Sequence, residues 1–331
     1  GVNGLRGMVV DFSKTNPEGW ENVSMHSYNR TELAVYETHI ADVSSSSTWG
    51  GTASKAKKYG GMYEKGTTFT SGDTTVKTGF DHIKELGVNA VQILPFFDQA
   101  NDEVNASFNW GYNPLNYNSL DGVYSSNPYD GYEKIKEFKE LVKAYNEEGI
   151  NIIMDVVYNH VNGATKSNFD VLMTEYYFRY SIDGTLSNGS GCGNETRSEV
   201  SMMRKFIKDS TEFWAKEYKL GGFRFDLMGL HDIQTMNEVT ANLKEKIDEN
   251  IFVHGEPWAG GTTPLLSSNA ANQSNLSKFV GYGAFNDHLR DSLIKGGLSD
   301  KADKGWATNP TEVSEADYAK LTSGILGRTS S

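Results

Sequence analysis

Residues 151–158 read NIIMDVVY, an apolar run whose only charged residue is Asp155. This composition is typical of a strand inside a parallel sheet, where both faces are covered. Similar runs lie at 34–40 (AVYETHI), 89–95 (NAVQILP), 222–227 (GFRFDL) and 251–256 (IFVHGE), with a weaker one at 279–285. The sequence therefore predicts six buried strands.

Segments with helical periodicity separate these strands. Apolar side chains recur every three or four residues within 132–145, 203–214 and 233–247. Glycine precedes several strands, at Gly87, Gly149 and Gly221, where a left-handed residue commonly ends a helix. The alternation of strand and helix predicts a parallel α/β sheet.

Two architectures share this alternation, an open doubly wound sheet and a (β/α)8 barrel of the TIM type. No G-x-G-x-x-G loop follows the first strand, which weakens the nucleotide-binding form of the open sheet. In a barrel, functional side chains gather at the carboxyl ends of the strands, and the unusual polar residues of this chain lie there. We therefore expect 34–331 to form a (β/α)8 barrel with about six of its eight strands and a long insertion at about 160–197. We expect 1–33 to lead in from an upstream domain.

Composition excludes several classes of function. The 331 residues carry 43 acidic and 31 basic side chains, giving a net charge of −12. Such a protein is poorly suited to nucleic acid or to an anionic membrane surface. No apolar run is long enough to cross a bilayer, and the single cysteine, Cys192, allows neither an intrachain disulfide nor a cysteine-based zinc site. We expect neither nucleic acid nor a membrane as a partner.

Two carboxylates end neighbouring predicted strands. Arg224 and Asp226 are two residues apart and point to the same side of the fourth strand, while Glu256 ends the fifth. Facing one site, Asp226 and Glu256 could act as a nucleophile and a general acid/base. Arg224 would keep Asp226 ionised, and apolar neighbours would raise the pKa of Glu256. The alternative is a structural Arg–Asp pair beside an unrelated surface glutamate.

The third strand adds polar candidates. Asp155 lies inside an apolar strand and needs a partner, for which Arg224 is the obvious choice. Asn159 and His160 follow that strand, and His160 could bind a substrate hydroxyl. Its alternative is a loop histidine bonded to the backbone.

Aromatic residues indicate the kind of ligand. Trp110, Tyr112 and Trp258 could offer flat apolar faces beside polar groups, a mixture that suits sugar rings. Core packing is the alternative for each of them. An acidic protein with aromatic loops fits neutral carbohydrate better than nucleic acid.

Seven motifs occur in order along the chain: YETHIAD at 36–42, GVNAVQILP at 87–95, FNWGYNP at 108–114, DVVYNH at 155–160, GSGCGNET at 189–196, GFRFDLMG at 222–229 and HGEPW at 254–258. Together they resemble type I pullulanases, debranching enzymes of the alpha-amylase superfamily (glycoside hydrolase family 13). The FNWGYNP segment resembles the motif that separates pullulanases from other members.

The resemblance implies roles for the strand-end residues. Asp226 would form a glycosyl-enzyme intermediate, and Glu256 would protonate the leaving oxygen and then activate water. Arg224 would orient Asp226. The implied reaction is retaining hydrolysis of α-1,6 linkages in pullulan, amylopectin or limit dextrins.

The resemblance also implies how an α-glucan binds. His160 and Tyr112 would hold the sugar on the non-reducing side of the cut, and Trp258 would line the leaving side. Asp155 and Asn159 would support the site. No cofactor is required; calcium occurs in the superfamily, and the oxygen-rich residues 101–105 could bind it.

Two departures from the family stand out. Asn113 replaces an aspartate of the FNWGYNP-type motif, and no His-Asp pair follows Glu256, where the family has its third catalytic carboxylate. We therefore expect a piece of a longer barrel, completed by its C-terminal part or by a complementing chain. An α-1,4-acting amylase or neopullulanase and an inactive carbohydrate-binding fragment remain alternatives. A secreted or cell-surface location is favoured over the cytoplasm.

The 331-residue chain by itself should show little or no debranching activity, because the third carboxylate is missing after Glu256. Reducing-sugar release from pullulan measures this, with a full-length pullulanase as the positive control. A rate close to that of the control would contradict the expectation.

Overall fold

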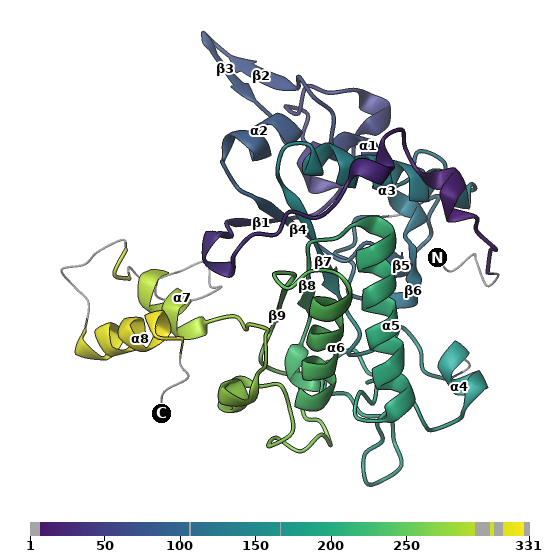
Figure 1. The fold of residues 1–331 in the computed structure, drawn as a ribbon, viewed down its shortest axis with the longest axis vertical. Helices are drawn as coiled ribbons and strands as arrows, with labels where there is room; N and C mark the ends of the chain where they lie inside the picture. Colours follow the sequence, from purple (N-terminus) through teal and green to yellow (C-terminus); the bar gives the residue numbers. More distant parts are fainter. Residues whose placement is uncertain (1–6, 106, 166, 295–304, 308–313, 328–331) are drawn as a thin grey trace.

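A parallel five-stranded sheet forms the centre of the protein (Figure 1). The computed structural model describes residues 7–294 except 106 and 166, together with 305–307 and 314–327. The strand order is β1-β4-β7-β8-β9, and every neighbouring pair is parallel. The strands are β1 (Val35–Thr38), β4 (Ala90–Ile93), β7 (Asn151–Val156), β8 (Gly222–Phe225) and β9 (Phe252–Gly255).

The first five predicted strands are confirmed, each slightly shorter than its apolar run. The sixth, at 279–285, is not formed. Gly281 has a φ of 83° and interrupts the extended chain, and glycine weakens strands generally. The segment nevertheless follows the free edge of β9, because the amides of Gly283 and Phe285 donate to the carbonyls of Val253 and Gly255 at 2.9 and 3.0 Å.

The helices that cover the sheet agree with the predicted periodicity. They are α3 (Gly131–Asn146), α5 (Ser201–Tyr218) and α6 (Ile233–Lys246), with the shorter α1 (Tyr59–Met62), α2 (Gly79–Glu85) and α4 (Asn168–Leu172). Gly87 and Gly149 take the left-handed conformation after their helices, as predicted. After α5, the left-handed residue is Lys219, with a φ of 55°. Gly221, which was predicted to take this conformation, does not take it. In the part of the chain that the structure describes, no helix is both long and apolar enough to span a bilayer.

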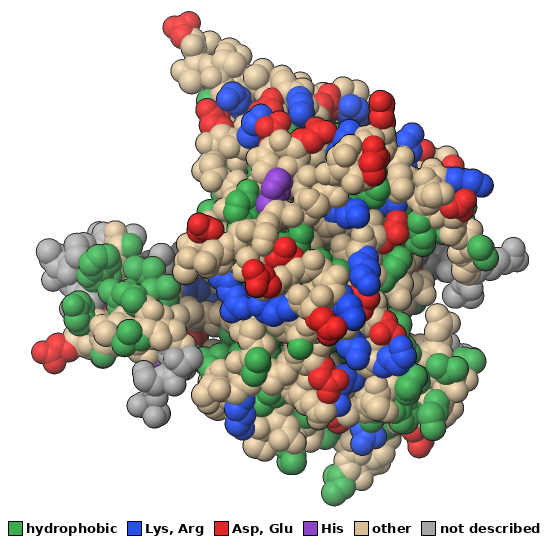
Figure 2. Space-filling view, viewed as in Figure 1, with side chains coloured by type: hydrophobic (Ala, Val, Ile, Leu, Met, Phe, Trp, Pro, Cys, Tyr) green, Lys and Arg blue, Asp and Glu red, His purple; other side chains and the backbone are tan. Residues whose placement is uncertain are grey.

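Two small antiparallel pairs and a helical pair lie outside the main sheet. The strands are β2 (Thr68–Ser71), β3 (Thr74–Lys77), β5 (Phe97–Gln99) and β6 (Pro114–Leu120), and the helices are α7 (Asp287–Ile294) and α8 (Glu315–Ile325). The helical pair lies to one side of the sheet (Figure 1). Figure 2 shows hydrophobic side chains gathered on it, and Tyr318, Ile325 and Leu326 are each more than half exposed.

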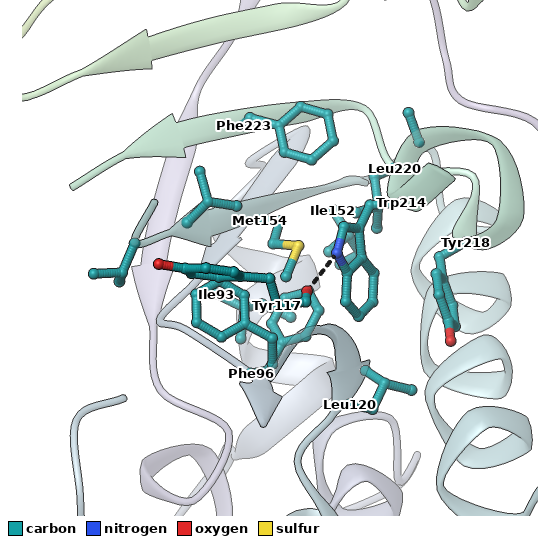
Figure 3. Packing of buried hydrophobic residues seen from close by; sticks show 14 of the residues in the cluster. Ile93, Phe96, Tyr117, Leu120, Ile152, Met154, Trp214, Tyr218, Leu220 and Phe223 are labelled. Atoms are coloured by element: carbon teal, nitrogen blue, oxygen red, sulfur yellow. Dashed lines mark hydrogen bonds between the residues drawn. The ribbon is translucent and has the colours of Figure 1, made fainter. Parts of the chain in front are cut away.

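Trp214 of α5 packs against the central strands (Figure 3). Its indole lies close to Met154 of β7, and the Trp214 Nε1–H donates to the carbonyl of Tyr117 at 3.0 Å. Trp214 stacks on Tyr218 with 4.8 Å between ring centroids. This core fixes β7 and β8, whose carboxyl ends carry the predicted site.

The described part of 1–33 packs on α3 and on the start of β7. Trp20 and Val23 join the main hydrophobic core. The buried Lys139 Nζ of α3 donates to Thr15 Oγ1 at 2.9 Å and to Asn16 Oδ1 at 2.6 Å. A buried ammonium needs such partners, because burial without them is costly.

Met154→Ala should lower the free energy of unfolding by about 2–5 kcal/mol, because Met154 is fully buried in the central strand. Chemical denaturation monitored by circular dichroism measures this. Met202→Ala is the matched control. Because Met202 is 47% exposed, this substitution should lower the free energy of unfolding by no more than about 0.5 kcal/mol. Equal losses in the two variants would contradict the described core.

Candidate active site

Arg224 of β8 contacts three carboxylates at the carboxyl end of the sheet. Its Nη1 lies 2.9 Å from Asp155 Oδ1 and 3.0 Å from Asp226 Oδ1. Its Nη2 lies 2.7 Å from Glu256 Oε1. The structure thus brings together the ends of β7, β8 and β9, and the Asp226 and Glu256 side chains share one guanidinium.

The site places three carboxyl groups around one guanidinium. Burial disfavours the ionised form of a carboxyl group. It raises the pKa of Asp155 to about 8 and also raises the pKa of Glu256, in both cases against the opposing effect of Arg224. Burial alone would lower the pKa of Arg224, but the carboxylates, Asp155 first, hold it well above its ordinary value. Glu256 is therefore suited to carry a proton that it can donate.

Asp226 is held in one orientation by two donors. Arg224 Nη1 donates to Oδ1, and Asn159 Nδ2 donates to Oδ2 at 2.9 Å. Asn159 Nδ2 also lies 2.9 Å from the Asp226 carbonyl oxygen, so it fixes the backbone as well. These bonds fix both carboxylate oxygens, as a positioned nucleophile requires.

The turn after Asp226 is strained and contacts Glu256. Leu227 has φ 40° and ψ 49°, a left-handed conformation that is unfavourable for a leucine. In this conformation its amide donates to Glu256 Oε2 at 2.9 Å. The amide of Gly229 donates to the Glu256 carbonyl at 3.0 Å. The backbone that follows the aspartate therefore also positions the glutamate.

Tyr112 and His160 complete the buried side of the site. Tyr112 donates its hydroxyl to Asp155 Oδ2 at 2.8 Å, and its ring centroid lies 5.9 Å from the Arg224 guanidinium carbon. The ring nitrogens of His160 face Asn159 Oδ1 at 2.7 Å and the Tyr112 carbonyl at 3.1 Å. Burial lowers the pKa of His160, and a neutral ring donates to only one of these oxygens at a time.

The two predicted tryptophans differ in exposure. Trp110 is 65% exposed. Trp258 follows β9 and lies 6.3 Å from the Phe285 ring, measured between centroids. Trp110 thus offers an open face to solvent, whereas Trp258 is partly covered.

Two residues near the site were not predicted. Phe285 lies 5.7 Å from the Arg224 guanidinium carbon, measured from its ring centroid. Glu37 of β1 accepts from Gln92 Nε2 at 2.5 Å, and its charge contributes to the raised pKa of Glu256. The rule that functional groups follow strand ends could have found Glu37. Phe285 ends the predicted sixth strand, so the same rule could have drawn attention to it, although the segment does not form a regular strand.

Residues 12–180 match the family described as the alpha amylase catalytic domain. The chain belongs to the alpha-amylase family. It is 35% identical to the pullulanase of Bacillus subtilis (strain 168), over 95% of this chain and 43% of that protein. This confirms the resemblance to pullulanases inferred from the seven motifs.

Solved pullulanase structures share the fold. The pullulanase from Paenibacillus barengoltzii in complex with maltohexaose and α-cyclodextrin matches with a TM-score of 0.86 at 41% identity, over 92% of this chain and 47% of that one. The pullulanase from Bacillus acidopullulyticus matches with a TM-score of 0.89 at 36% identity, over 99% and 39%. This alpha-amylase family chain spans less than half of each relative. The expected (β/α)8 class is confirmed, with five strands of its sheet among the described residues.

The oxygen-rich segment 101–105, which could bind calcium, is bonded to its own turn and to the loop at 121–122. Asn101 Nδ2 donates to Asp121 Oδ2 at 2.8 Å, and Glu103 Oε1 accepts from the Gly122 amide at 2.8 Å. Asp102 Oδ1 accepts from the amides of Val104 and Asn105 at 2.9 and 3.1 Å. Among the residues that the structure describes, no group of three or more His, Cys, Asp or Glu side chains is placed to hold a metal ion.

Asp155→Asn should reduce the dependence of stability on pH. The folded-state pKa of about 8 lies above the usual value of about 3.9 in an unfolded chain. The group therefore stabilises the fold at low pH, and this contribution is lost as the pH rises from about 4 through about 8. Urea denaturation at pH 5 and pH 8 should show a smaller fall in unfolding free energy for Asp155→Asn than for the wild type.

Glu256 has a raised pKa and contributes in the same direction, so part of the wild-type slope should remain in this variant. Asp183→Asn, at an exposed loop position, is the control and should keep the wild-type slope. An unchanged slope in Asp155→Asn would show that Asp155 is ionised in the fold throughout this range.

Proposed function

We propose that this site hydrolyses α-1,6-glucosidic branch linkages of α-glucans with retention of configuration at the anomeric carbon. The observation that carries the proposal is the shared contact of Asp226 and Glu256 with Arg224. Retaining glycosidases need two carboxyl groups at short range, about 5–5.5 Å apart. Membership of the alpha-amylase family and similarity to pullulanases support the same chemistry.

In this mechanism Asp226 attacks the anomeric carbon while Glu256 donates its proton to the leaving glycosidic oxygen. Burial raises the pKa of Glu256 and so favours the protonated form that the first step needs. Glu256, now a carboxylate, then takes a proton from the water that hydrolyses the glycosyl-enzyme. Arg224 and Asn159 hold the attacking carboxylate throughout.

The proposed substrate is an α-glucan such as pullulan, amylopectin or a limit dextrin. Trp110 presents an exposed aromatic face near the site, and aromatic faces suit the apolar sides of sugar rings. The Paenibacillus barengoltzii pullulanase was solved with maltohexaose and α-cyclodextrin, which supports the same class of ligand here. The FNWGYNP segment favours α-1,6 cleavage over the α-1,4 cleavage of an amylase or neopullulanase.

Two measurements test the proposal. Calorimetric titration with maltohexaose tests α-glucan binding by the chain itself. Product analysis on pullulan, using the active polypeptide that carries this site, tests the bond that is cut. Maltotriose as the product supports α-1,6 cleavage, panose would indicate α-1,4 cleavage, and binding without turnover in every form tested would support a carbohydrate-binding protein.

Asp226→Asn should lower the turnover number of the active polypeptide by about a thousandfold or more, because the amide cannot form the glycosyl-enzyme bond. Maltohexaose affinity should change little, since the variant is nearly isosteric. Asp209→Asn on α5, whose side chain is 51% exposed, is the matched control. Turnover that survives in Asp226→Asn would remove Asp226 from the nucleophile role.

A further inference from the structure

The segment 108–112 runs from the solvent to the catalytic pair. Phe108 and Trp110 are 57% and 65% exposed. Two residues further on, Tyr112 donates to Asp155 inside the site. Large exposed aromatic side chains beside a site mark a binding surface. The position of this backbone therefore decides where the exposed rings stand relative to Asp226.

Besides the Tyr112–Asp155 bond, two contacts fix the inner half of the segment. Gly111 has a φ of 102°, and a Cβ there would lie 2.5 Å from the Pro95 carbonyl oxygen, so only glycine fits. His160 Nε2 lies 3.1 Å from the Tyr112 carbonyl. Neither contact involves the outer half, which carries Phe108 and Trp110.

The outer half is held by the Asn109 side chain, whose Oδ1 accepts from the Gly111 amide at 3.0 Å, and by His39, which follows β1. His39 is 5% exposed, and its Nδ1 accepts from the amide of Ala41 at 3.1 Å. The proton of the neutral ring must then be on Nε2, which donates to the Asn109 carbonyl at 3.0 Å. Burial lowers the pKa of His39 and favours this neutral form.

Two further contacts surround the same ring. The Phe108 ring centroid lies 4.9 Å from that of His39. The Tyr124 hydroxyl lies 2.9 Å from Nε2 and competes with the Asn109 carbonyl for its proton. His39 therefore touches the outer segment through both the Asn109 backbone and the Phe108 side chain.

We propose that His39 is a positioning residue for α-glucan binding: its bond to Asn109 holds Trp110 ready to stack on a glucosyl ring outside the bond that is cut. The inference deepens the proposed function and rests on it. A loop that is ordered before the ligand arrives loses less conformational freedom on binding. The affinity for a long maltooligosaccharide therefore depends on a residue that acts through Asn109.

Two substitutions at His39 separate the two bonds of its ring. Asparagine can accept from the Ala41 amide but is too short to reach Asn109, whereas glutamine keeps a donor near the position of Nε2. The dissociation constant for maltohexaose should rise about three- to tenfold in His39→Asn. His39→Gln should stay nearer the wild-type value. Isothermal titration calorimetry measures both, and thermal unfolding verifies that the variants fold.

A double-mutant cycle tests whether His39 acts through Trp110. Trp110→Ala should weaken binding by itself, and adding His39→Asn to it should cost little more. A full additional loss in the double variant would place the effect of His39 elsewhere and overturn the inference. Wild-type affinity in His39→Asn would overturn it as well.

Tyr124→Phe gives a second test that leaves His39 in place. It removes the competing hydroxyl and leaves the Asn109 carbonyl as acceptor for Nε2, so affinity should be equal to or tighter than that of the wild type. Weaker binding in a folded Tyr124→Phe variant would contradict the assigned bond. A wild-type chain that does not bind maltohexaose at all would instead refute the proposed function, and the inference with it.

Discussion

The candidate active site depends on a single buried guanidinium that contacts three acids. Arg224 contacts Asp155, Asp226 and Glu256. Ions removed from water need partners of good geometry, and the loss of one partner from such a group is strongly destabilising. With one positive charge for three carboxyl groups, protonation of one acid relieves the imbalance. Burial raises the pKa of Glu256, and the guanidinium that keeps Asp226 in place opposes this rise.

Much of the fold can be predicted from the sequence, because strands and helices are indicated by patterns of neighbouring residues. The apolar runs around Asp155 and Arg224 are long enough to indicate buried strands, and the helical periodicity of 132–145 is clear over four turns. The sixth strand fails at Gly281, where a left-handed residue breaks an otherwise extended segment. Lys219, two residues before the predicted glycine, takes the left-handed conformation after α5.

The residues of the site likewise fall into those that the sequence predicts and those that only the structure shows. Asp226 and Glu256 could be paired from the sequence because parallel strands end at one edge, a rule that needs no distances. Phe285 and His39 also lie at the ends of predicted strands, 279–285 and 34–40, but their contacts could not be predicted, because these depend on packing between segments far apart in the sequence. His39 contacts Asn109, 70 residues away in the sequence. The motif resemblance added roles to residues, but the hydrogen bonds that hold those residues come only from the structure.

The strained turn at Leu227 has a consequence for anyone who wants an inactive version of this site for trapping sugar complexes. Glu256 faces a cation through one oxygen and accepts a backbone amide with the other. A glutamine in its place can satisfy the Leu227 amide only by turning its own NH2 group toward Arg224, where two donors would meet. Glu256→Gln would therefore disturb the loop next to Asp226 as well as remove the proposed acid. Asp226→Asn meets the same conflict on its other side: with its oxygen toward Arg224, its NH2 group faces the NH2 group of Asn159.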